Sequence, residues 1–172
     1  MSPERDYNDD EIRVEAESII TTSLAIDVFD GIITDDNPSE DDKMTGLDQC
    51  LYFLFEDEYS DKELEYLKKK TLKLADKFAI GRRKNGAEIQ IGHYMYAPSV
   101  LPVEYMPEFL SKAVFLHTAG KITNNNPSPK NGLTGLDQVI LHFFCPSKKD
   151  YEIIKEIIIA DTISYSGGYR RR

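Results

Sequence analysis

Three histidines and two cysteines are the side chains of this sequence best suited to metal binding or nucleophilic catalysis. They are His93, His117, His142, Cys50 and Cys145. His142 and Cys145 are three residues apart, but zinc sites are built from close pairs of ligands, and no second close pair is present. The sequence also lacks a Gly-x-Ser-x-Gly elbow and a glycine-rich phosphate loop. We therefore predict no metal site, no cofactor and no catalytic group, and an enzyme is not the favoured class.

Carboxylates are concentrated in the first part of the chain. Residues 1–66 hold 21 Asp and Glu against 4 Lys and Arg, a net charge of −17, whereas residues 67–172 have a net charge of +8. Such asymmetry favours oriented association with a charged partner, or head-to-tail association of copies into a homo-oligomer. We predict a partner-binding surface in one acidic loop, formed by Asp35, Asp36, Glu40, Asp41 and Asp42.

A basic stretch at residues 68–84 is the second electrostatic feature. Lys69, Lys73 and Lys77 recur at helical spacing, and Arg82 and Arg83 follow them. A helix with acids at its start and cations at its end suits the helix dipole, so the simplest interpretation is a solvated face. Nucleic-acid binding through the same stripe is an alternative. The net charge of −9 for the whole chain argues against it as the main role.

The chain contains an internal repeat that positions these residues. Gly31 to Phe55 aligns with Gly120 to Phe144 without a gap, and 12 of the 25 positions are identical. The motifs NPS and TGLDQ occur in both copies, whereas the acids of the first loop become Asn, Pro and Lys in the second. Two copies are too few for an open solenoid, so we predict two repeats that pack face to face around a pseudo-two-fold axis.

Glycine and glutamine within TGLDQ are less easily explained than the other shared residues. Gly46 and Gly135 lie just inside a predicted helix, where glycine is unfavourable, and Gln49 and Gln138 are polar at the start of an apolar helix. One hypothesis is that glycine allows the repeats to touch and glutamine bonds across the contact. The other is that a small anion or a carboxylate binds the free amides of each helix start. His117 is a further candidate for a pocket between the repeats.

Helical periodicity predicts three helices in each repeat. Thr45 with Asp48, and Thr134 with Asp137, have the spacing of a capping box, and apolar residues recur from Ile12 to Val28. The predicted helices cover residues 8–31, 45–55 and 60–86 in the first repeat and 107–120, 134–144 and 147–163 in the second. The fold class is therefore all-α, with about six helices. A short β pairing of Ile33 with Ile122, or an extended linker, is left open.

These elements divide the chain into four parts. Residues 1–86 form the first repeat, 87–102 a linker, 103–165 the second repeat and 166–172 a flexible basic tail, all within one compact unit. No apolar run is long enough to cross a bilayer and the first residues lack a secretion signal, so we expect no membrane association and a cytoplasmic location.

The favoured function is that of a non-enzymatic interaction module or inhibitor, which binds a basic protein partner through the acidic surface. The alternatives are a small-molecule-binding protein or enzyme with a pocket between the repeats, and nucleic-acid binding through residues 68–84.

Overall fold

The computed structural model describes residues 9–55, 58–85, 103–144 and 148–170 of the chain. Within these ranges the chain forms six α-helices and one short 3-10 helix, with no strand, which confirms the all-α class. The elements are α1 (Asp9–Phe29), α2 (Gly46–Phe55), α3 (Asp61–Asn85), η3 (Val103–Tyr105), α4 (Met106–Thr118), α5 (Gly135–Phe144) and α6 (Lys148–Arg170). None of the described helices is long and apolar enough to cross a membrane.

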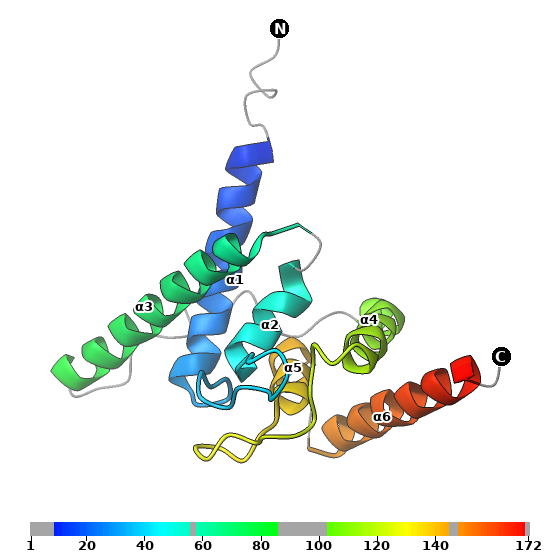
Figure 1. The fold of residues 1–172 in the computed structure, drawn as a ribbon. Helices are drawn as coiled ribbons and strands as arrows, with labels where there is room; N and C mark the ends of the chain where they lie inside the picture. The colour runs from blue at the N-terminus through cyan, green and yellow to red at the C-terminus, as the bar shows by residue number, and fades with distance from the viewer. Residues whose placement is uncertain (1–8, 56–57, 86–102, 145–147, 171–172) are drawn as a thin grey trace, which may run out of the picture.

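Helices α2 and α5 pack against each other at the centre of the molecule. Helix α1 packs on α3 to one side, and α4 packs on α6 to the other (Figure 1). Two loops run along the same end of the central pair: the first loop (residues 30–45) enters α2 and the second loop (residues 119–134) enters α5. The central helices are the most apolar, because they are covered on several sides.

The main core lies around α2 and α5 and includes α4. The Phe53 ring of α2 lies 5.0 Å from the Phe109 ring of α4 and 4.9 Å from the Phe143 ring of α5. Leu47 and Leu136, at equivalent places in the TGLDQ motifs, have no exposed surface. These contacts fix the directions in which α2 and α5 begin, and therefore the positions of both loops.

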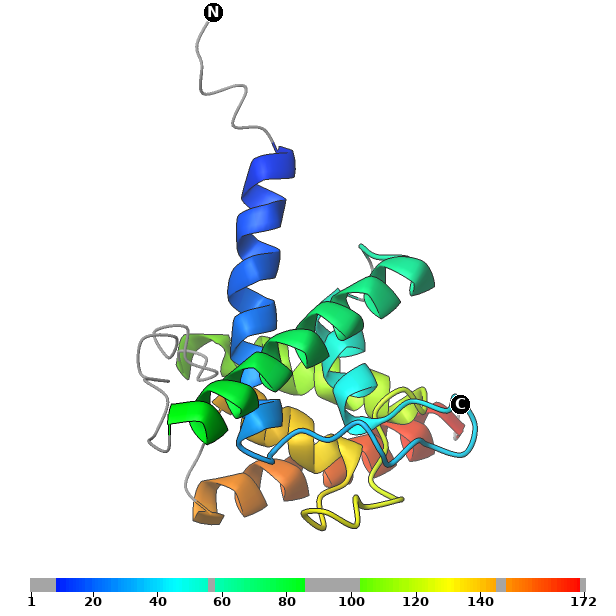
Figure 2. The same cartoon turned by 90° about the vertical axis from the view of Figure 1, so that its left-hand side faces the viewer.

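Helix α1 extends beyond the other helices at its N-terminal half (Figure 2). Ala16 and Ile19 belong to the apolar pattern that predicted a buried stripe, but Ala16 is exposed and Ile19 is 51% exposed. The stripe is buried only further along, where Leu24 has no exposed surface. The reason is geometric, because a regular pattern buries residues only where a neighbouring helix reaches them.

Other sequence-based expectations differ from the structure in detail. Ile33 and Ile122 do not pair: the Ile33 amide donates to the Asp27 carbonyl and the Ile122 amide to the Leu116 carbonyl, each closing the end of its own helix. Helix α6 continues to Arg170, past the predicted end of the second repeat at residue 165. The predicted linker, residues 87–102, lies outside the described residues, as do His93 and Cys145.

Candidate functional site

Two of the acids predicted to bind a partner are paired with lysines from other elements. The Asp35 carboxylate lies 3.0 Å from the Nζ atom of Lys68 on α3, and the Asp42 carboxylate lies 3.2 Å from Nζ of Lys121 in the second loop. Asp35 also accepts a hydrogen bond of 2.8 Å from the Thr45 hydroxyl. These two carboxylates hold loops and helices together, which leaves less of their charge available to a partner.

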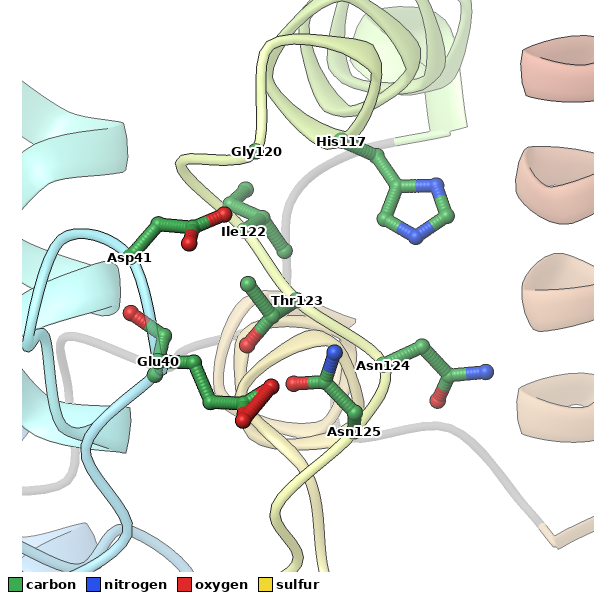
Figure 3. A pocket seen from close by; sticks show the side chains of 9 residues that line it. Glu40, Asp41, His117, Gly120, Ile122, Thr123, Asn124 and Asn125 are labelled. Carbon is green, nitrogen blue, oxygen red and sulfur yellow. The ribbon is translucent and has the colours of Figure 1, made fainter.

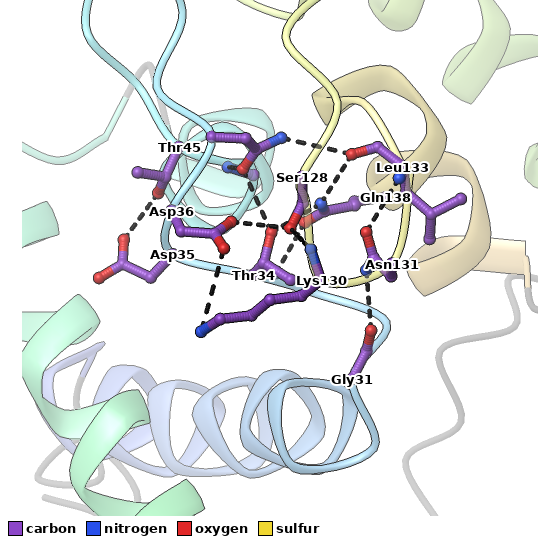
Figure 4. A network of polar contacts seen from close by, with 12 residues as sticks. Gly31, Thr34, Asp35, Asp36, Thr45, Ser128, Lys130, Asn131, Leu133 and Gln138 are labelled. Carbon is purple, nitrogen blue, oxygen red and sulfur yellow. Dashed lines mark hydrogen bonds and ion pairs between the residues drawn. The ribbon is translucent and has the colours of Figure 1, made fainter.

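Asp36 joins the first loop to the second. It accepts a hydrogen bond of 2.8 Å from the Ser128 hydroxyl, and Lys130 lies 3.9 Å from its other oxygen. Figure 4 shows Asp36 between these two side chains, and shows Asn131 reaching across to the carbonyl of Gly31 at 2.8 Å. The second loop therefore carries polar groups that match the acids of the first.

Glu40 and Asp41 differ from the other acids of the loop. Both are exposed, and neither side chain has a hydrogen bond or ion pair with another described residue. They line a hollow of about 200 Å³ together with His117 and part of the 120–125 segment. Of the five predicted carboxylates, these two keep their charge most fully available to a partner.

His117 lines the same hollow but is turned away from these carboxylates. Figure 3 shows Glu40 and Asp41 on one side of the 120–125 segment and His117 on the other. The Nδ1 atom of His117 lies 3.0 Å from the Thr162 hydroxyl, which itself donates to the Ile158 carbonyl at 2.7 Å. Because that hydroxyl has only one hydrogen, Nδ1 must be the donor. Burial lowers the pKa of His117, so the ring is neutral near pH 7 and forms no pair with a carboxylate here.

The glutamines of the two TGLDQ motifs cross between the loops. The Thr34 amide donates to Gln138 Oε1 at 2.9 Å, and Gln138 Nε2 donates to the Thr34 hydroxyl at 3.0 Å. The Thr123 amide and hydroxyl make the same two bonds to Gln49, also at 2.9 and 3.0 Å. Both glutamines have no exposed surface, so they do not line an open pocket.

Gly46 and Gly135 lie directly against these glutamines. A Cβ atom added at Gly46 would be 1.9 Å from Gln138 Oε1, and one added at Gly135 would be 1.9 Å from Gln49 Oε1. The Gly46 amide is not free for an anion, because it donates to Asn37 Oδ1 at 2.9 Å. The absence of a side chain at both glycines is explained by this close approach.

Both predicted capping boxes form, and each is held by a lysine that the sequence did not reveal. In α2, the Thr45 amide donates to Asp48 at 3.0 Å, and Lys68 of α3 lies 3.0 Å from the other Asp48 oxygen. Burial alone lowers the pKa of Lys68, but its hydrogen bonds to Asp48 and Asp35 outweigh burial and raise that pKa above 10.5. The capping carboxylate of α2 is therefore also an anchor for α3.

The second capping box is anchored in the same way. The Thr134 amide donates to Asp137 at 3.0 Å, and Lys155 of α6 lies 2.8 Å from the other oxygen, which also accepts from the Tyr151 hydroxyl. Burial raises the pKa of Asp137, but the bonds from Lys155, Tyr151 and the Thr134 amide lower it below 3.8. Asp137 is thus a structural carboxylate that folding keeps ionised.

The basic stripe on α3 is largely free in the structure. Lys69, Lys73 and Lys77 are exposed, and none has a hydrogen bond or ion pair with another described residue. Tyr66, one turn before Lys69, is 61% exposed. Arg82 and Arg83 belong to the last turns of the same helix.

A hollow that sequence reasoning missed lies between the start of α2, the start of α3 and both loops. It has a volume of about 370 Å³. We call it the acidic groove; its lining residues are Asp42, Met44, Asp48, Leu51, Tyr52, Asp61, Leu64, Glu65 and Lys121. Asp61 and Glu65 are exposed, and their side chains have no hydrogen bond or ion pair with another described residue. In the sequence, these two acids could be recognised only as part of an acidic helix start.

Two buried side chains of a reactive type have surroundings that give them a structural role. His142 Nδ1 lies 2.6 Å from Asp27, and both residues are less than one tenth exposed. Burial raises the pKa of the Cys50 thiol, and the charge of Asp27 adds to this effect.

No group of three or more His, Cys, Asp or Glu side chains in the described part of the chain is placed to hold a metal ion.

Comparisons with protein-family models, with curated proteins and with solved structures give no significant match, so the site is interpreted from its own geometry.

Proposed function

We propose that this chain is a protein-interaction module or inhibitor that binds a basic partner through an acidic surface. The surface comprises Glu40 and Asp41 of the first loop and the acidic groove beside them, with Asp61 and Glu65 at the start of α3. The observation that carries the proposal is that these four exposed side chains have no partner among the described residues. The neighbouring acids Asp35, Asp36 and Asp42 are matched by lysines.

The unpaired acids favour association in two ways. Uncompensated carboxylates on one part of a surface steer a cationic partner and raise its rate of encounter, an effect that weakens as salt rises. The partly exposed apolar residues of the groove, such as Met44 and Tyr52, add contact area that charge alone does not provide. Rim charges mainly set specificity and rate, and the groove supplies the buried part of the contact.

An internal duplication underlies the proposed surface. We infer that the two halves are copies of one three-helix unit related by an approximate two-fold rotation. The inference is supported by the reciprocal glutamine bonds, by both capping boxes, and by the lysines Lys68 and Lys155, which bond the capping Asp in each half. The acids of the first loop are not shared by the second copy, so they diverged after the duplication, as a binding surface specific to one copy would.

The test is capture of basic proteins from native lysate on immobilised chain, at low and at high salt, read out by mass spectrometry. The comparison variant neutralises the four acids as Glu40→Gln, Asp41→Asn, Asp61→Asn and Glu65→Gln. A matched control neutralises four exposed acids elsewhere, as Glu104→Gln, Glu108→Gln, Glu152→Gln and Glu156→Gln. We expect salt-sensitive capture of a basic protein by the wild type and the control but not by the comparison variant. Capture of no basic protein by the wild type, or equal capture by the comparison variant, refutes the proposal.

A second candidate is nucleic-acid binding through α3, because its exposed lysines stand beside an exposed aromatic ring. The test is fluorescence anisotropy of a labelled single-stranded oligonucleotide in a salt series. Lys69→Gln with Lys73→Gln and Lys77→Gln is expected to weaken binding and to reduce its salt dependence. The absence of binding by the wild type at low salt removes this candidate.

A further inference from the structure

We propose that the acidic groove anchors one arginine side chain of the basic partner, in the place now taken by the chain's own Lys121. This inference deepens the proposed function and rests on it. Lys121 is the one cation among the described residues that line the groove. Its ammonium lies 3.2 Å from the Asp42 carboxylate and 5.6 Å from the centre of the Tyr52 ring. A cation over an aromatic face and beside a carboxylate is therefore already accommodated there.

The resident lysine is held only weakly. The Lys121 side chain is 34% exposed and the Asp42 side chain 33%, so water and salt screen the ion pair that they form. Exposed pairs of this kind contribute little to stability. An incoming cation can therefore displace the Lys121 ammonium into solvent at little cost.

Two features make the groove better suited to arginine than to lysine. Asp61 and Glu65 bring two carboxylates that have no described partner, in addition to Asp42, which Lys121 only partly neutralises. A guanidinium presents several donors in a plane, stacks on an aromatic face and loses less hydration than an ammonium. The apolar side chains of Met44 and Leu64, which are only partly buried, provide a surface for the methylene stem of the arginine.

The same groove also excludes other ligand chemistries. With Asp42, Asp48, Asp61 and Glu65 in its lining, it repels phosphates and carboxylates. Asp48 is fully engaged, because it caps α2 and pairs with Lys68. On binding, Asp42 and Tyr52 therefore exchange Lys121 for the arginine, and Asp61 and Glu65 gain a partner.

The test uses fluorescein-labelled octa-arginine and octa-lysine peptides of equal charge and follows their anisotropy. The readout is the ratio of the two dissociation constants. Because the two peptides carry equal charge, this ratio does not depend on the overall charge of the protein. We expect the wild type to bind octa-arginine about two- to fivefold more tightly, the effect of an exposed cation–π contact. Tyr52→Leu is expected to weaken octa-arginine binding more than octa-lysine binding and so to bring the ratio to about one, with folding checked by circular dichroism. A ratio near one in the wild type, or an unchanged ratio in Tyr52→Leu, overturns the proposal.

The second part of the test removes the resident cation, the Lys121 ammonium. Lys121→Gln is expected to strengthen octa-arginine binding by about two- to fivefold, because Asp42 and Tyr52 become available. Lys149→Gln makes the same change of charge at an exposed position of α6 and is the matched control. Equal effects of the two substitutions show that only overall charge matters and refute the groove as the anchor. Salt-sensitive capture of a basic protein from lysate tests the proposed function separately. Failure of the arginine anchor can therefore be distinguished from failure of the proposed function.

Discussion

The contact between Gly46 and Gln138 predicts an unusually large effect for a small substitution. Gly46→Ala places a Cβ atom 1.9 Å from Gln138 Oε1, a distance that no real contact tolerates. The helix backbone of α2 cannot retreat, because Leu47 beside it has no exposed surface. The Gln138 side chain must therefore move, although it too has no exposed surface.

The magnitude follows from what Gln138 loses. It accepts from the Thr34 amide at 2.9 Å and donates to the Thr34 hydroxyl at 3.0 Å and to the Leu133 carbonyl at 3.2 Å. Each such bond contributes about 1 kcal/mol net, so their loss costs about 3 kcal/mol. Alanine is favoured over glycine within a helix by up to about 1 kcal/mol, which offsets part of the loss. We expect Gly46→Ala to lower the free energy of unfolding by about 2–3 kcal/mol.

The assay is urea unfolding followed by circular dichroism and by tyrosine fluorescence, whose coincidence supports a two-state analysis. A double-mutant cycle isolates the contact. Gln138→Ala by itself is expected to cost about 3 kcal/mol, because it leaves the buried Thr34 amide without its acceptor. Adding Gly46→Ala to that variant then costs nothing further, since the obstructing atom is gone.

Additive effects in this cycle would refute the reasoning, because they would mean that Gly46 and Gln138 do not interact. Gly135→Ala offers an internal comparison, since it meets Gln49 at the same 1.9 Å. We expect a loss of similar size there. A neutral Gly135→Ala beside a costly Gly46→Ala would contradict the equivalence of the two contacts.

Three further predictions concern buried or paired ionisable groups. Folding depresses the pKa of Asp137 below 3.8, so its stabilisation is present above that pH and is lost as the pH falls through the folded value. When the free energy of unfolding in urea is measured between about pH 5 and pH 2, Asp137→Asn should lose less of it than the wild type. An equal loss in both proteins contradicts the depressed pKa of Asp137. His142→Phe should cost about 3 kcal/mol by leaving Asp27 buried without its partner, whereas adding Asp27→Leu should restore most of the loss in the same assay. In a Cys145→Ser background, Cys50 should react with Ellman's reagent only in urea, because burial raises its pKa and shields the thiol; fast reaction of the native protein would be the opposite result.

The roles of individual carboxylates show how far sequence reasoning reached. Asp48 and Asp137 were predicted as capping residues, and each accepts a hydrogen bond from the amide of the threonine three residues before it. The acids of the first loop were predicted as one binding surface, but Asp35 and Asp42 are paired with lysines of α3 and the second loop. Nothing in the sequence distinguishes a paired carboxylate from a free one when its partner is distant along the chain.

Local chemistry determined the helices of this protein from its sequence alone. Apolar spacing, capping boxes and glycines at the helix ends act over a few residues, so they could be read without a structure. Gly31 and Gly120, for example, adopt φ values of +85° and +80° after α1 and α4, as the end of a helix favours. The tertiary structure decided which part of the apolar stripe of α1 is buried, which acids keep an unpaired charge, and where the acidic groove lies. These properties depend on the directions in which helices pack, and Lys68 and Lys121 reach their carboxylates only after that packing has formed.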